Sequence, residues 1–408
     1  MHRPKTRLCA TRSTLSLFFV ASLGSTPALG AGEESQAPAS TGSAITTKAS
    51  TEVSGYIDTD HIAVVSPSIA GGISDEVAGW EISGHYLVDV VSAASVDIVS
   101  TASTKWTEIR HAGSAEGSVK VGPLAVGASG VVSSEPDYLS LAGGGTLTVD
   151  LLDKNVTPFV GFSYGQDKVG RTDLPREFWR DKQILSGQLG VTFVVDRSTI
   201  ASIQGDVIAE TGYLAKPYRY VPVFTAAQAS AIQPGASIAQ VNATRLDQRP
   251  AEQLPNARHR FALTSRVAHR FEGSTLRLDE RAYGDSWGVL ASTTDFRFMV
   301  DLGRRLTLWP HLRFHGQNQA SFWQRAYVAT ASAGGGPGIP VIRAGDRELS
   351  PLYNATGGGG ARLKLVDDPR RPWSLVFEID ASYTRYLNAL YISNRTSVFS
   401  TMAVEAEF

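Results

Sequence analysis

The sequence is almost without cysteine, and it has no large excess of charge of either sign. Cys9 is the single cysteine among the 408 residues, and the formal net charge is -1. If the segment that contains Cys9 is removed, the mature chain has no thiol for a disulfide, a cysteine metal site or a cysteine nucleophile. The balanced charge gives no indication of a nucleic-acid partner or a polybasic membrane anchor. After residue 30, no run approaches the roughly 18 apolar residues of a membrane helix.

The N-terminus has the layout of a secretory signal peptide. Several basic residues precede the short apolar run L-S-L-F-F-V-A-S-L, and the small residues Ala28 and Gly30 follow it. This order predicts that residues 1–30 are removed. Residues 31–50, rich in Gly, Ser, Ala and Thr, are expected to form a flexible leader before a folded unit at 51–408. No cysteine follows the apolar run, so we expect no lipid anchor on a cysteine.

The C-terminal residues alternate between apolar and polar with a period of two. Met402, Val404 and Phe408 have one parity, and Glu405 and Glu407 have the other. This period indicates a strand with one apolar face and one wet face, because successive side chains of a strand point to opposite sides. The segment W-S-L-V-F-E-I-D-A-S-Y repeats the pattern with an aromatic ring at each end, which is typical of a strand that spans a membrane.

The same alternation recurs along the chain, and turn residues separate the segments. Short turns join one alternating set of strand pairs and longer connections join the other, which is the layout of an outer-membrane barrel. We therefore predict an all-β fold, a transmembrane antiparallel up-and-down β-barrel of about 16 strands. Closure is required because an open sheet edge cannot lie in lipid. The expected strands are 51–58, 62–72, 78–90, 109–121, 124–133, 138–151, 155–165, 184–195, 199–212, 258–271, 274–284, 291–302, 305–315, 358–366, 373–386 and 396–408.

Two alternatives to this barrel remain open. Pro67 lies in the second expected strand, and proline disfavours a central strand. If residues 51–72 fold into the lumen instead, the barrel has 14 strands. A secreted β-sandwich would also bury an apolar stripe, but it would not need aromatic rings at both strand ends or a terminal Phe on the outward face.

Five short motifs are spread along the chain. They are Y-L-V-D-V-V-S-A-A-S-V-D-I-V-S-T-A-S at 86–103, S-S-E-P-D-Y at 133, K-P-Y-R-Y-V-P at 216, R-A-Y-G-D-S-W-G at 281 and D-R-E-L-S-P-L at 346. Together they resemble domain-of-unknown-function family 3570, an uncharacterised family of Gram-negative outer-membrane proteins. The resemblance implies a transmembrane β-barrel over residues 50–408, and it implies no substrate. The terminal Phe408 also looks like the general signal by which outer-membrane barrels are delivered for assembly, so we expect Phe408 to face lipid.

A barrel of this kind needs a polar inner face, and the sequence places many charges there. The expected strands from 258 to 315 carry arginines with interleaved aspartates, and the last two strands carry carboxylates. Segregated charge across a water-filled pore would select solutes by charge and dipole. Pairing of Arg with Asp on neighbouring strands is the other interpretation, and both can hold at once. The expected lumen-lining residues are Arg258, Arg260, Arg266, Arg277, Arg281, Arg297, Arg313, Asp279, Asp295, Glu378, Asp380, Glu405 and Glu407.

Three patterns that resemble chemical sites have a simpler structural explanation. Ser163 lies in G-x-S-x-G, but no turn and helix follow it directly, as a nucleophile elbow requires. His311 and His315 would stand roughly 13 Å apart on a strand, which is too far for one metal ion. Glycines 357–360 lack the G-K-[ST] of a phosphate loop. We therefore expect no catalytic, cofactor-binding or metal-binding residues and no enzyme activity.

The predicted function is that of a porin-like passive channel for small polar solutes, because about sixteen strands usually enclose an aqueous interior. The alternative is a plugged, non-conducting barrel that serves as an envelope scaffold or partner protein, with residues 31–75 as the plug. The long loops 213–257 and 316–357 are expected to confer specificity. The expected partners are outer-membrane lipid, the barrel assembly machinery and small polar solutes, without nucleic acid. The expected location is the cell outer membrane.

Overall fold

The computed structural model describes residues 45–92, 107–331, 337–368 and 371–408. The predicted signal peptide and most of the predicted leader lie outside these residues. Within the described part of the chain, no helix is long and apolar enough to cross a membrane.

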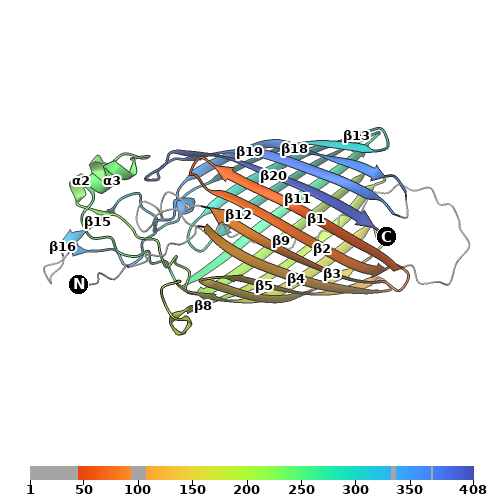
Figure 1. The fold of residues 1–408 in the computed structure, drawn as a ribbon, viewed down its shortest axis with the longest axis horizontal. Coiled ribbons are helices and arrows are strands. Elements are labelled where there is room, and N and C mark those ends of the chain that lie inside the picture. Colours follow the sequence, from red (N-terminus) through yellow and green to blue (C-terminus); the bar gives the residue numbers. More distant parts are fainter. Residues whose placement is uncertain (1–44, 93–106, 332–336, 369–370) are drawn as a thin grey trace, which may run out of the picture.

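Sixteen long strands of the described chain form one closed antiparallel barrel (Figure 1). Each strand pairs with its neighbours around the wall, and β1 pairs with β20 to close the ring. The strands are β1 (Ile45–Asp58), β2 (Ala63–Asp75), β3 (Trp80–Ser92), β4 (Thr107–Val121), β5 (Leu124–Glu135), β6 (Tyr138–Val149), β7 (Val156–Val169), β8 (Arg180–Asp196), β9 (Thr199–Gly212), β11 (Ala257–Phe271), β12 (Ser274–Asp285), β13 (Leu290–Leu302), β14 (Leu306–Gln317), β18 (Leu352–Val366), β19 (Trp373–Tyr386) and β20 (Asn394–Glu407).

The first two strands belong to the barrel wall, so the predicted number of sixteen is confirmed and the alternative of fourteen is wrong. On the two sides of Pro67, Val65 pairs with Val90 and Ser68 pairs with Leu87, in one continuous register. Proline has no N–H to donate, which accounts for the interruption of the β2–β3 ladder at this point. The register is the same on both sides of the interruption. The suggested plug at 31–75 is therefore wrong for its described part, because those residues form strands of the wall.

Several strands begin earlier than the sequence pattern indicates, and β1 and β18 show the largest differences. β1 begins at Ile45 rather than at residue 51, and β18 begins at Leu352 rather than at residue 358. The added segments contain few large apolar residues, so their alternation is weak. They are nevertheless paired along their length, because the neighbouring strands β2 and β14 supply the backbone hydrogen bonds. Residues 45–50 of the predicted leader therefore belong to β1.

The outward face of the barrel is apolar. On β11, Phe261, Leu263 and Val267 are exposed, and on β2 the same holds for Ile69 and Ile73. The residues between them have the opposite parity and face the interior. An apolar belt of this extent is unfavourable in water and is the outer surface of a membrane-spanning barrel.

The two rims of the barrel differ. At one rim the connections are short, and Gly122 and Gly273 have positive φ values of 59° and 76° in two of the turns. Glycine adopts this conformation without the steric cost of a side chain. The opposite rim carries the long connections 213–256 and 318–351, as Figure 1 shows. We call the described residues of these two connections the cap.

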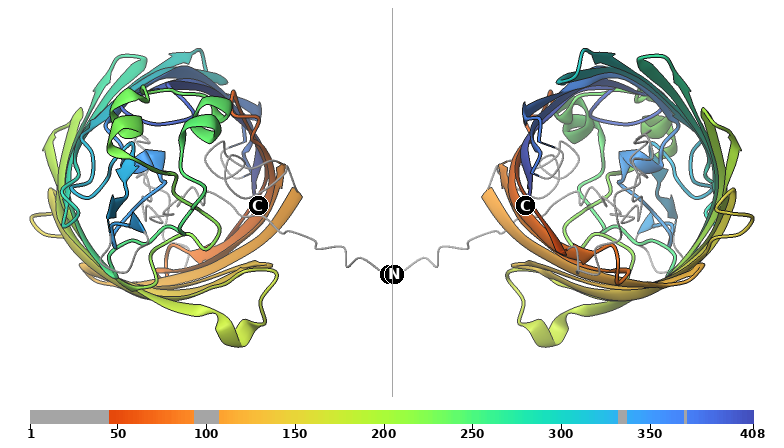
Figure 2. Two further views of the ribbon diagram at one scale, coloured as in Figure 1. Left: turned by 90° about the vertical axis from the view of Figure 1, so that its left-hand side faces the viewer. Right: turned by 90° about the vertical axis from the view of Figure 1, so that its right-hand side faces the viewer.

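The connections at that rim contain short elements of their own. In Figure 2 (left), α2 and α3 lie within the outline of the wall, whereas the connection with η1 projects outside it. The elements are η1 (Arg176–Phe178), β10 (Val223–Phe224), α2 (Ala226–Ala231), α3 (Ile238–Thr244), β15 (Tyr327–Val328), β16 (Thr330–Ala331), β17 (Pro337–Gly338) and η2 (Arg347–Leu349).

The cap packs in two hydrophobic clusters that it shares with neighbouring connections. Trp323 packs in one buried cluster with Trp287 and Val289 of the β12–β13 connection and with Leu254, Ala215, Ala320, Ala344 and Leu349. A second cluster consists of Phe224, Ile232, Ala236, Val241 and Leu390. Burial of this kind stabilises a folded unit, so the long connections form a packed structure over the mouth.

Buried ion pairs join the segments of the cap to one another and to the barrel. Arg219 pairs with Asp346 at 2.8 Å and with Glu252 at 3.4 Å. Burial alone would raise the pKa of Asp346, but the Arg219 charge and a backbone N–H outweigh it, so this pKa is lowered. Arg347 pairs at 2.5 Å with Asp60 in the β1–β2 connection. Removing one partner of such a pair would leave an uncompensated buried charge.

Candidate functional site

The predicted lumen-lining residues lie on the inner face of the wall. Arg281 on β12 reaches Asp206 on β9 at 2.7 Å, although β11 lies between these strands. Arg362 on β18 reaches Glu405 on β20 at 2.7 Å across β19. Side chains on the concave side of a barrel converge, so contacts that pass over an intervening strand belong to that side.

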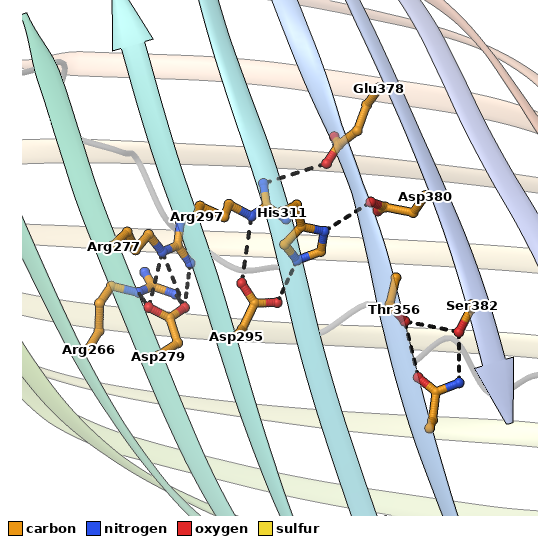
Figure 3. Close-up of polar contacts among 11 residues, drawn as sticks. Arg266, Arg277, Asp279, Asp295, Arg297, His311, Thr356, Glu378, Asp380 and Ser382 are labelled. Carbon is orange, nitrogen blue, oxygen red and sulfur yellow. Dashed lines mark hydrogen bonds and ion pairs between the residues drawn. The ribbon is translucent and has the colours of Figure 1, made fainter. Parts of the chain in front are cut away.

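The arginines of the predicted basic wall are mostly paired with carboxylates beside them. Arg266 donates two hydrogen bonds to Asp279, at 2.9 and 2.8 Å, and Arg277 donates to the same carboxylate at 2.6 Å (Figure 3). The other pairs of this wall are Arg258 with Asp285, Arg260 with Glu210, and Arg270 with Asp301. The wall is therefore a ladder of ion pairs rather than a surface of unpaired positive charge.

The predicted acidic wall is also largely neutralised. The Nη1 atom of Arg297 lies 3.7 Å from Oε1 of Glu378 on β19. Its Nε atom lies 3.7 Å from Oδ1 of Asp295 on the same strand as Arg297. Asp380 contacts His311, and Glu405 pairs with Arg362 as described above. Glu407 lines a cavity of about 710 Å³ near the short-turn rim together with Glu405, Glu81 and Lys48. Arg297 and His311 thus connect carboxylates of the two predicted walls into one network.

His311 is the centre of this network. Its Nε2 lies 2.9 Å from Asp295 Oδ2 on β13, and its Nδ1 lies 3.0 Å from Asp380 Oδ1 on β19. The side chain is buried, with 4% of the residue exposed. Figure 3 shows the imidazole between the two carboxylates, with Glu378 beside them. The sequence pattern relates His311 only to His315 and gives no sign of this cluster.

Glycines on β18 make the cluster possible. β18 lies between β14, which carries His311, and β19, which carries Asp380. A Cβ atom on Gly358 would lie 2.2 Å from Asp380 Oδ1, and one on Gly360 would lie 2.4 Å from the Trp309 ring. The absence of side chains at these two inward positions lets groups on β14 and β19 meet across β18. The run of glycines 357–360 is therefore explained by packing, and it lies within a strand.

Arg313 differs from the other predicted arginines. Its side chain is exposed on the inner face of β14, and among the described residues it forms no ion pair. Asp295, which is opposite Arg313 in the strand register, contacts His311 instead. His315, on the same face, has Thr293 at 2.8 Å and Gln317 at 3.3 Å as its partners. Arg313 therefore presents a positive charge to the interior.

The side of the barrel opposite β18 has small residues on its inner face. β6 is the sixth strand around the ring and β18 is the fourteenth, so half of the sixteen strands separate them. Gly144 on β6 pairs with Ser163 on β7, and Ser163 pairs with Ser186 on β8. Ser163 lies within a continuous strand, so no strand–turn–helix elbow forms around it. The small residues of β6, β7 and β8 thus lie across the barrel from β18, β19 and β20.

The closed wall, the apolar outer face and the charged interior define a membrane-spanning β-barrel of the outer-membrane type. Within that class, the chain belongs to the family described as protein of unknown function (DUF3570), whose model matches residues 91–367. The predicted family is confirmed. No curated protein sequence matches the chain.

The chain is also similar in fold to solved outer-membrane proteins. The outer membrane protein opdK from Pseudomonas aeruginosa has a TM-score of 0.42 and 7% identity, covering 89% of this chain and 99% of that chain. The CymD monoaromatic hydrocarbon channel has a TM-score of 0.40 and 9% identity, covering 89% and 88%. A mutant of the ferric enterobactin receptor PfeA from Pseudomonas aeruginosa has a TM-score of 0.40 and 9% identity, with 84% of this chain covered. This chain spans about half of that receptor, 54% of its length.

Proposed function

We propose that the protein is an outer-membrane channel through which small polar solutes diffuse passively. The observation that supports this proposal is the polar interior, in which the paired charges of β9, β11, β12 and β13 share the inner face with small residues of β6, β7 and β8. Such an interior is wet and hydrogen-bonding, and it offers no continuous apolar surface to a greasy solute. Removal of residues 1–30, delivery by the barrel assembly machinery and insertion into the outer membrane are parts of the same proposal.

Arg313 provides the sharpest test of this proposal. We expect single-channel steps from the refolded mature chain in a planar bilayer, and a reversal potential in a salt gradient that reports ion selectivity. Arg313→Glu should shift this selectivity toward cations, because it replaces an exposed positive charge of the interior by a negative one. Lys154→Glu makes the same change of charge in the exposed β6–β7 turn and should leave the selectivity unchanged.

The packed cap favours a second candidate function, a barrel that is closed and acts as an envelope scaffold or partner protein. The cap packs in hydrophobic clusters with neighbouring connections and contains buried ion pairs, which a simple open pore does not require. A folded, heat-modifiable barrel without single-channel steps would contradict the channel and support the scaffold. Currents whose selectivity does not respond to Arg313→Glu would show that ions do not pass this wall.

A further inference from the structure

We propose that His311, Glu378 and Asp380 form a binding site for a divalent transition-metal ion on the lumen wall. One ligand atom of each residue lies within 4.8 Å of the ligand atoms of the other two. His311 comes from β14, and the two carboxylates are two residues apart on one face of β19. Figure 3 shows all three side chains converging over β18. Gly358 has no side chain to fill the space between them.

Asp295 completes the arrangement by orienting the imidazole. A metal-binding histidine commonly donates its second ring N–H to a carboxylate, which fixes the tautomer and makes the ligating nitrogen more basic. Asp295 Oδ2 lies 2.9 Å from Nε2 of His311 and can accept this hydrogen bond. Nδ1 is then directed at Asp380 Oδ1, at 3.0 Å. Asp295 is thus a positioning residue rather than a ligand.

The contact between His311 Nδ1 and Asp380 Oδ1 needs a positive charge between its two atoms. With the Nε2 proton donated to Asp295, Nδ1 and a carboxylate oxygen are both acceptors and repel each other. A proton on Nδ1 satisfies the contact, and a metal ion can take the place of that proton. Binding then releases one proton, from the imidazolium to solvent, as the nitrogen–metal bond forms.

The ligand set favours one class of ion. One imidazole nitrogen and two carboxylate oxygens suit Zn²⁺ or Mn²⁺, whereas Ca²⁺ and Mg²⁺ prefer ligands that are all oxygen. Two carboxylates also balance the charge of a divalent ion. The side chains of Glu378 and Asp380 are 25% and 16% exposed, so the site opens to the lumen on one side. Arg297, at 3.7 Å from Glu378, is the cation that the metal must compete with.

The test is a titration of the full mature chain in detergent with Zn²⁺, using a competing chromophoric chelator, and with Mn²⁺, followed by electron paramagnetic resonance. We expect one ion per chain, and binding of Ca²⁺ that is much weaker. His311→Gln and Glu378→Gln should each lower the Zn²⁺ affinity by at least about tenfold, the scale on which metal sites respond to lost partners. His315→Gln removes a histidine of the same strand face that has no carboxylate partner in the described part of the chain, and it should change nothing.

Two further measurements separate a metal site from a general effect on folding. Arg297→Gln should tighten Zn²⁺ binding, because it removes the competing cation while leaving all three ligands. Proton release on Zn²⁺ binding, measured from the dependence of the binding heat on the buffer, should be lost in His311→Gln. Equal Zn²⁺ affinity in the native chain, His311→Gln and Glu378→Gln would overturn the proposal. Neither result depends on whether the barrel conducts.

Discussion

At the scale of single residues, Gly358 allows His311 and Asp380 to contact each other on the lumen wall. Its position on β18 faces inward, between the strand of His311 and the strand of Asp380. Because Gly358 has no side chain, groups on β14 and β19 can come into contact across β18. The charged network depends on this gap as much as on the charges themselves.

Gly358→Ala should destabilise the barrel by about 1–3 kcal/mol, the usual cost of an added group in a packed site. The new Cβ would lie 2.1 Å from the backbone oxygen of Ile379, which cannot move without disturbing the ladder. Urea unfolding in detergent, followed by tryptophan fluorescence, measures the loss. Gly357→Ala is the matched control, because its Cβ would meet the Leu312 side chain at an ordinary 3.6 Å. Equal stability of the two variants would contradict the role of the gap.

Sequence alone could assign the face of each charged residue but not its partner. Strict alternation placed Arg266 and Asp279 on the inner face, and both lie there as an ion pair. The contact between His311 and Asp380 could not be predicted in the same way. It requires the order of three strands, their relative register and a glycine at one position, and the two residues are 69 positions apart.

At the scale of elements, strands and connections were not equally predictable. A strand of the wall has a local period and was found from it, with errors mainly at its ends. The cap was predicted as long loops at the correct rim, but its packing combines segments that are far apart in the chain. Trp323, for example, packs with Leu254 and Val289. No local sequence pattern predicts such contacts.

Trp323→Ala should loosen the cap without unfolding the barrel. Trp323 is 4% exposed, and its Nε1–H donates to the backbone oxygen of Asp346 at 2.9 Å. Truncation of a buried Trp usually lowers the free energy of unfolding by about 3–5 kcal/mol. We expect this loss to exceed the stability of the cap. Limited proteolysis should then cleave 213–256, while heat-modifiable migration of the barrel persists.

Val341→Ala is the control for this change, because Val341 lies in the cap and is 68% exposed. It should leave the cap resistant to protease. If the channel proposal holds, Trp323→Ala should also raise the single-channel conductance, since the cap lies over the mouth. Loss of the whole barrel together with the cap would show that the two fold as one cooperative unit.

At the scale of the whole molecule, the barrel depends on one seam between the two ends of the chain. β1 pairs with β20 from Lys48–Glu407 to Asp58–Ser397. Phe408 extends this pairing, because its N–H donates to the oxygen of Thr47 at 2.8 Å. An unclosed seam would leave backbone groups unpaired in lipid, where each costs several kcal/mol. Pairing of the last strand with the first thus closes the barrel.

Phe408 should matter more for assembly in the cell than for the stability of the finished barrel. Its side chain is 51% exposed and makes an edge contact with Trp373, at 5.8 Å between ring centroids. A half-exposed ring adds on the order of 1 kcal/mol to stability. Phe408→Ser should therefore change the urea midpoint of the refolded protein little, yet lower the amount of folded barrel in outer membranes several-fold. Phe261→Ser, at a position 54% exposed and distant from the seam, tests the alternative that any outward ring matters equally, because a matching loss in that variant would remove the special role of the terminus.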